Sequence, residues 1–364
     1  MTIFLKILLI LIISSCSAKI SNFDSYNKIY LSKSPFAPSQ LELKKNKSKI
    51  IIFEFDDKKS DIAKNISLGN IAAKKVESII AKNKLGDIID RSNQKKLKKE
   101  ITLAQINNDF SYQGPDQANY AITGVITGAS FNSKYISEKK IYNEEKNRYS
   151  YIPAKFEYRS KVIGKINIIE LPSTNIVKNI SFIGRGYQEE DAESTSAIEF
   201  GSLKIGNKIS EPKKYNDSIM IEATNQAIHL ISEDIMNSFA PIGYITEKRK
   251  YKDKFIFKIN LGRDDGMKQN NKVKIFTKNN VKNELTKEVD IERKMIASGR
   301  ISNIINDNTS WIIIDNKENT NKIRLGDQVK IYYHKNFFKR NNEKINTAKQ
   351  ILKTSKEIAE LFMK

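Results

Sequence analysis

The chain has 364 residues and a formal net charge of +21, with one cysteine and two histidines. A single cysteine excludes an internal disulfide, and two histidines leave few side chains for metal or acid–base chemistry. The excess lysine comes with abundant asparagine and isoleucine along the whole chain, which is typical of AT-rich codon usage. We therefore expect the positive charge to be spread over all surfaces, and we expect no nucleic-acid partner.

The first residues predict an exported, lipid-anchored protein. Lys6 precedes the apolar run 7–13, which is too short to span a bilayer and is typical of a signal-peptide core. Two serines then lead to Cys16, the only thiol. This arrangement resembles the lipobox of bacterial lipoproteins, in which the cysteine is acylated and the chain is cleaved before it. Residues 1–15 are therefore expected to be a lipoprotein signal peptide and Cys16 the lipidation site; the alternative is an ordinary export signal with an incidental cysteine.

The next segment, residues 16–47, is polar, contains two prolines and shows no periodicity. Such a composition predicts a flexible tether between the lipid and the folded part of the chain.

Regular structure is predicted from residue 48 onward. Apolar runs indicate strands, and apolar residues at helical spacing indicate helices. The expected elements are a strand at 50–55, a helix at 68–81, a short strand at 87–90, a helix at 93–105 and a strand at 119–127. This β-α-β-α-β order is typical of a layered α/β domain.

A long β region follows. From residue 152 to 168 the even positions are mostly apolar and the odd positions mostly polar, a period of two that predicts a long strand. Residues 176–187 are expected to return as its partner in a β-hairpin. An amphipathic helix is predicted at 219–239, ending before Pro241. We therefore place the first domain at 48–241.

Short strands separated by turns fill the rest of the chain. About five strands between 242 and 336 predict a small antiparallel β-barrel domain. Residues 337–364 are expected to form a basic C-terminal helix. The predicted fold class is thus α+β or α/β, with a layered domain, a barrel and a final helix.

Catalytic chemistry is not predicted. His229 falls within the helix 219–239, where packing is the simpler role. Asp56–Asp57 end a strand and Asp264–Asp265 lie in a glycine-flanked turn, where structural roles are the simpler interpretation. No thiol, histidine pair or phosphate-binding glycine loop indicates a nucleophile, a metal or a cofactor. We expect a protein that is not an enzyme.

Several segments together resemble one family, the curli-secretion lipoproteins (the CsgG family), over about residues 1–240. They are the lipobox, the strand 50–55, the helix 68–81, Ile88-Ile-Asp-Arg91 leading into Gln94-Lys-Lys-Leu-Lys-Lys-Glu100, Ala118-Asn-Tyr-Ala-Ile-Thr-Gly124, Lys165-Ile-Asn-Ile-Ile-Glu-Leu171 and the helix 219–239. Their order and spacing carry the resemblance.

The resemblance implies a lipoprotein on the periplasmic side of the outer membrane, held by the acylated Cys16 and assembled into a homo-oligomeric ring. Ser17 in place of aspartate favours the outer membrane. In the best-known members each subunit lends two β-hairpins to a shared barrel that passes unfolded fibre subunits to the cell surface without catalysis. Other proteins of a secretion or appendage system are the implied partners. Residues 128–147 are highly charged, so whether 128–216 form transmembrane hairpins stays open.

A second resemblance favours a different function. Leu261-Gly-x-x-x-Gly266 followed by 272–276, and Leu325-Gly-Asp-Gln-Val-Lys-Ile331, are similar to the C-terminal barrel of a periplasmic flagellar accessory protein. The alternative is therefore a ring or scaffold lipoprotein for a flagellum or for cell-wall machinery. A third hypothesis is a binder of anionic polymers, which the positive charge favours.

Overall fold

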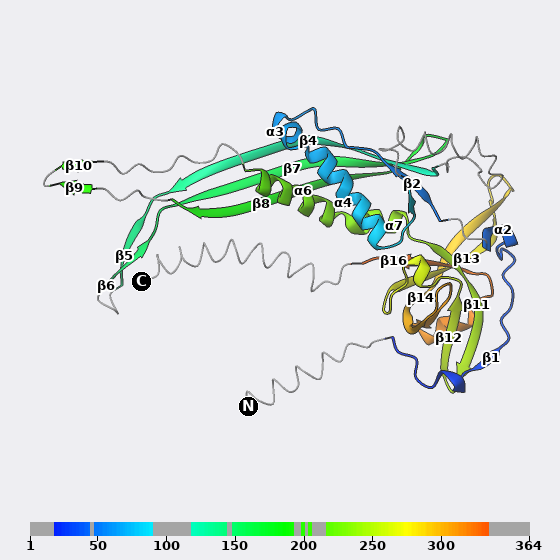
Figure 1. The fold of residues 1–364 in the computed structure, drawn as a ribbon. Helices are drawn as coiled ribbons and strands as arrows, with labels where there is room; N and C mark the ends of the chain where they lie inside the picture. Colours follow the sequence, from blue (N-terminus) through cyan, green and yellow to red (C-terminus); the bar gives the residue numbers. More distant parts are fainter. Residues whose placement is uncertain are drawn as a thin grey trace, which may run out of the picture. The chain divides into compact units, whose positions relative to one another are not determined.

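The computed structural model describes residues 18–43, 47–89, 118–143, 148–192, 198–200, 203–205 and 216–334 (Figure 1). These residues are mostly β-strand and divide into two compact units. The sheet unit holds the described residues within 50–78 and 89–232, and the barrel unit those within 18–49, 79–88 and 233–334. In these ranges no helix is both long and apolar enough to cross a membrane.

A five-stranded sheet contains the long strands of the sheet unit, in the order β3-β2-β4-β7-β8. Its strands are β2 (Lys49–Ile52), β3 (Asp87–Ile88), β4 (Tyr120–Ile136), β7 (Lys155–Glu170) and β8 (Ile176–Asp191). β2 runs parallel to β4, and β7 runs antiparallel to both of its neighbours, β4 and β8. Two short hairpins, β5 (Lys139–Asn143) with β6 (Arg148–Ile152) and β9 (Ile198–Phe200) with β10 (Leu203–Ile205), come after β4 and after β8.

The two-residue period predicted for the long strand is confirmed. Even-numbered residues of β7 from 156 to 168 are buried, while most odd-numbered ones are partly or fully exposed. The predicted return of the chain is also confirmed, because β8 pairs with β7 along nearly its whole length.

The helices described between residues 61 and 238 are α3 (Asp61–Ile66), α4 (Leu68–Lys82), α6 (Asp217–Leu230) and α7 (Ser232–Ser238). α6 packs on β7 and β8, and a Cβ at Gly184 of β8 would lie 1.8 Å from the carbonyl oxygen of Ala223, so only glycine allows this close approach. The single helix predicted at 219–239 is two helices, because the chain leaves helical geometry at Ile231 and Ser232 Oγ donates to the His229 carbonyl at 2.7 Å.

The layered α/β domain predicted for 48–241 is not confirmed, since the described residues are mostly β. The helix predicted at 93–105 lies outside the described residues, as do the signal peptide 1–15 and the C-terminal helix 337–364.

Six antiparallel strands form a closed barrel in the barrel unit. They are β11 (Ile242–Tyr251), β12 (Lys254–Ile259), β13 (Lys272–Lys282), β14 (Val289–Ile305), β15 (Ser310–Ile314) and β16 (Gln328–Tyr332), with the short 3-10 helices η2 (Arg263–Asp265) and η3 (Lys317–Asn321) between them. The order is β11-β12-β15-β14-β13-β16, and β16 pairs back with β11. The core includes Phe257, Ile259, Ile275, Ile301, Ile312 and Val329. The predicted barrel is therefore present, with β11 as a strand beyond the five expected.

A segment that we call the strap, residues 18–36, lies along the barrel. It contains η1 (Phe23–Ser25) and β1 (Asn27–Ile29), and α2 (Gln40–Leu43) follows it. β1 pairs antiparallel with residues 248–250 of β11, on the edge where β16 pairs with residues 242–244. β12 occupies the other edge of β11. β1 thus continues the seam of the barrel beyond the end of β16.

The expectation of a flexible tether at 16–47 is therefore corrected for the strap. The physical reason is that main-chain pairing needs no periodic side-chain pattern, and that three spaced apolar residues, Ile20, Phe23 and Tyr26, provide contacts to the barrel.

Candidate functional site

The side chains that the sequence singled out do not form a catalytic constellation. In the part of the chain that the structure describes, no group of three His, Cys, Asp or Glu residues could hold a metal ion. His229 is exposed on α6, and His334 Nδ1 lies 3.9 Å from a carboxylate oxygen of Glu233. Cys16, the expected lipidation site, lies outside the described residues.

The acidic pairs have structural contacts. Asp57 Oδ2 accepts a hydrogen bond from the backbone N–H of Gly69 at 3.1 Å, and Asp265 Oδ2 accepts one from Gly262 at 2.8 Å within the turn that begins η2. These carboxylates therefore do not form a site. The candidate site is the strap, the described segment nearest to Cys16 in sequence, together with the barrel residues that it contacts.

The strap begins with a cluster of side-chain amides. The N–H of Ala18 donates to Asn270 Oδ1 at 2.8 Å, and its carbonyl accepts from Gln269 Nε2 at 3.2 Å. Asn303 makes both bonds to Ile20, accepting from the N–H at 2.6 Å and donating to the carbonyl at 3.3 Å. Three amide side chains of the barrel unit thus hold the main chain at Ala18 and Ile20, one and three residues after Ser17.

Aromatic packing holds the middle of the strap. Ile20 and Tyr26 are buried in a cluster with Ile256 and Trp311 of the barrel. The ring of Phe23 meets that of Trp311 edge-on, with centroids 5.1 Å apart. The guanidinium group of Arg249 lies 4.9 Å from the Phe23 centroid and 5.0 Å from that of Trp311, at cation–π distance of both rings.

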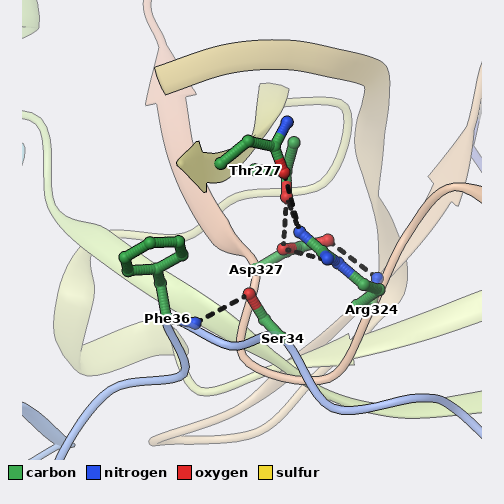
Figure 2. Close-up of polar contacts among 6 residues, drawn as sticks. Ser34, Phe36, Thr277, Arg324 and Asp327 are labelled. Atoms are coloured by element: carbon green, nitrogen blue, oxygen red, sulfur yellow. Dashed lines mark hydrogen bonds and ion pairs between the residues drawn. The ribbon is translucent and has the colours of Figure 1, made fainter. Parts of the chain in front are cut away.

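A buried polar cluster holds the end of the strap (Figure 2). Ser34 donates its N–H to the Leu325 carbonyl at 2.8 Å. The Asp327 carboxylate accepts from the N–H of Arg324 at 2.7 Å and from Thr277 Oγ1 at 3.1 Å, while the Arg324 guanidinium bonds Thr277 in turn. Burial raises the pKa of Asp327, and the hydrogen bonds that it accepts from Arg324, Thr277 and Ser34 act in the opposite direction.

The docked strap also lines an open pocket of about 320 Å³. Lys19 and Asn22 of the strap line one side, and Lys254, Lys317 and Thr320 of the barrel line the other. Next to this wall the buried ammonium of Lys248 donates to the Thr320 carbonyl at 3.0 Å and lies 4.6 Å from the centroid of the Phe255 ring. Burial lowers the pKa of Lys248, and nearby Lys250 acts in the same direction.

The site is thus an attachment site, in which the barrel binds its own N-terminal segment at three successive points. Sequence reasoning missed it because the contacting residues are polar amides and isolated aromatics. The one available signal was the group Ile20, Phe23 and Tyr26, spaced three residues apart in an otherwise polar stretch.

Comparison with known proteins adds little to this geometry. No family model matches the chain, and no curated protein matches it. Similar solved structures include lipoprotein GNA1162 from Neisseria meningitidis, at 10% identity and a TM-score of 0.22, covering 38% of this chain and 83% of that one. A neuraminyllactose-binding hemagglutinin homologue from Helicobacter pylori reaches 12% identity and a TM-score of 0.25, covering 59% and 97%.

The PelC dodecamer from Paraburkholderia phytofirmans matches at 12% identity and a TM-score of 0.19, covering 56% of this chain and 93% of that one. These TM-scores are too low to carry an argument about fold or function.

Proposed function

We propose that this protein is a lipid-anchored, non-enzymatic component of a CsgG-type system that secretes or assembles surface fibres across the outer membrane. In this proposal the acylated Cys16 holds the chain on the periplasmic side, and several copies assemble into a ring. The proposal rests on the sequence resemblance and on one topological observation in the sheet unit.

The observation is that two hairpins arise from the same end of the sheet. Ile136, the last residue of β4, pairs with Lys155, and Lys155 pairs with Asp191, the last residue of β8. The hairpin β5–β6 connects the first two of these positions, and the chain runs on from the third to the hairpin β9–β10 (Figure 1). The resemblance implies that each subunit lends two β-hairpins to a shared barrel, and two hairpins at one end of the sheet support this proposal.

The hairpin β5–β6 carries exposed aromatic side chains. Tyr142 and Tyr149 are paired across the strands, with ring centroids 5.1 Å apart, and Tyr151 donates to Glu138. Tyrosine is enriched where a protein crosses from lipid to water, because its ring is apolar and its hydroxyl polar. The hairpin is thus suited to a membrane interface or to the neighbouring subunit of a ring.

A scaffold without a pore remains the alternative function. The strands of β5–β6 have five residues each, fewer than the roughly nine to eleven that a transmembrane strand needs. The closed barrel with its glycine turns also favours the alternative: Gly266 has φ 77° and Gly326 has φ 86°, in the two motifs that resemble the flagellar accessory barrel. In this alternative, the chain is a periplasmic ring or scaffold lipoprotein for a flagellum or for cell-wall machinery.

The test begins with the protein extracted in detergent from membranes. Electron microscopy should find rings, and reconstitution into planar bilayers should give conductance. Replacing Tyr142, Tyr149 and Tyr151 together by serine should reduce the conductance, whereas Tyr30→Ser, which changes a fully exposed tyrosine of the barrel unit, should not. Rings without conductance would favour the scaffold, and a monomer that stays soluble without detergent would exclude both.

The lipid anchor has its own test. Cys16→Ala should abolish incorporation of a labelled fatty acid and release the protein from the membrane fraction. Labelling that persists in this variant would contradict the anchor.

A further inference from the structure

One face of the β13–β14 hairpin combines exposed apolar and basic side chains. Residues directly opposite each other in antiparallel strands lie on the same face, and alternate pairs share it. The pairs on the outer face of the barrel are Phe276 with Met295, Lys278 with Arg293, Asn280 with Ile291 and Lys282 with Val289. We call these eight residues the basic face.

The three apolar members of the basic face that lie on β14 are unusually exposed, whereas Phe276 on β13 is partly buried. Val289 is 61% exposed, Ile291 60% and Met295 50%, and Leu285 in the connecting turn is 93% exposed. Val289, Ile291 and Met295 lie on the same side of one strand, so they form a stripe, interrupted only by Arg293, and not scattered surface positions. Such a stripe indicates a contact surface.

The charges on this face are positive. Lys278, Lys282 and Arg293 alternate with the apolar residues, while the carboxylates of Asp290 and Glu292 belong to pairs on the opposite face. The neighbouring strand adds Lys330 to the same side, and β13 adds Lys274. From outside the strands, Glu42 lies near Lys278 at the barrel end of the face.

Two contacts hold cations flat against the sheet. The Arg293 guanidinium lies 3.9 Å from the centroid of the Phe276 ring, and Lys274 Nζ lies 4.1 Å from that of Tyr332. The opposite face is fixed by Arg324, whose guanidinium bonds Thr277 and lies 3.5 Å from Asn279 Oδ1. The barrel therefore fixes the base of the hairpin, and the basic face points away from the barrel interior.

We propose that the basic face docks onto a membrane surface that contains anionic phospholipids. The apolar stripe would enter the boundary between headgroups and acyl chains, while the lysine and arginine heads remain at the phosphates. A protein partner fits less well, because lysine is depleted in protein–protein interfaces. With the proposed lipid anchor at Cys16, the strap would also bring this hairpin toward the membrane, since Ala18 is bonded to Asn270, two residues before β13 begins. The inference does not require that Cys16 is acylated.

The experiment uses the full chain with Cys16→Ala, so that an acyl chain cannot contribute. Vesicles of phosphatidylcholine alone and of phosphatidylcholine mixed with phosphatidylglycerol are floated with the protein. We expect binding only to the anionic vesicles, and we expect it to weaken steeply with salt. Lys278→Gln with Lys282→Gln should weaken binding by about 30-fold, and Ile291→Ser should weaken it at low salt and at high salt alike.

The matched control removes the same charge elsewhere. Lys59→Gln with Lys64→Gln changes two exposed lysines of the sheet unit and should leave binding within about twofold. Equal loss in both double variants would show general attraction by net charge and would overturn the proposal. Equal binding to neutral vesicles, or no vesicle binding at all, would also overturn it; in the latter case a soluble protein or a second copy would be the occupant. Thermal unfolding of each variant checks that the barrel is intact.

Discussion

Removing the ring of Phe23 is the sharpest test of the strap. Phe23 is half-buried, meets Trp311 edge-on and lies under the guanidinium of Arg249. The aromatic pair contributes about 1 kcal/mol, the cation–π contact about 0.5–1 kcal/mol, and the partial burial of the ring adds a similar amount. Phe23→Ala should therefore weaken strap docking by about 2 kcal/mol, which corresponds to roughly 30-fold more frequent opening.

Amide hydrogen exchange measured by mass spectrometry reads this opening directly. Peptides that cover Ile20 and β1 should exchange roughly 30-fold faster in Phe23→Ala, while those from β12 and β15 should not change. The exchange rate of the Ser34 amide should increase less, because its N–H is bonded to the Leu325 carbonyl and Ser34 lies after β1 in the chain, whereas Phe23 lies before it. The control is Tyr30→Ala, which removes an exposed ring from the strap. The reasoning is refuted if peptides from 18–29 exchange at unprotected rates in the wild type, or if both variants behave alike.

Three further predictions concern packing and buried charge. Gly184→Ala should lower the free energy of unfolding by about 2–3 kcal/mol, because the new Cβ would meet the Ala223 carbonyl. Gly128 has open space around it, so Gly128→Ala should change the free energy of unfolding by less than about 0.5 kcal/mol. Urea denaturation of both variants measures this difference. Because burial raises the pKa of Asp327, the folded protein binds more protons than the unfolded chain just above the unfolded pKa of about 3.9, and the stability contributed by the carboxyl falls as pH rises through that window. Wild type measured against Asp327→Asn should therefore be relatively more stable near ~pH 4 than near ~pH 7, and a pH-independent difference would contradict the assignment. Lys248→Met should leave the melting temperature unchanged or raise it, since the ammonium is buried at a desolvation penalty; a large decrease would mean that its bond to Thr320 is worth more than that penalty.

The parts of the fold that were predictable share one property, which is a side-chain pattern that burial imposes. The even-numbered residues of β7 alternate because one side of the strand lies under α6, and α4 shows helical spacing for the same reason. The turn motifs at Leu261 and Leu325 were readable because Gly266 and Gly326 have positive φ, which glycine adopts without strain.

The missed parts lack such a pattern. β11 contains four consecutive charged residues, 247–250, and one of them, Lys248, is buried through aromatic and carbonyl contacts that no periodicity reveals. β1 is three residues long, with two of them exposed, and it is held by main-chain pairing, while distant Asn side chains hold Ala18 and Ile20 ahead of it. The attachment site was therefore not predictable from the sequence. Cys16 lies outside the described residues, so its lipidation stays a prediction.

The seam between β11 and its neighbours has a consequence for how the protein is handled and processed. Without β1, the main chain of residues 248–250 loses its partner on that edge, and an unsatisfied strand edge recruits strands from other molecules. Proteolysis or truncation that removes β1, residues 27–29, is thus expected to give aggregates or exchanged dimers, in which one molecule supplies the missing strand of another.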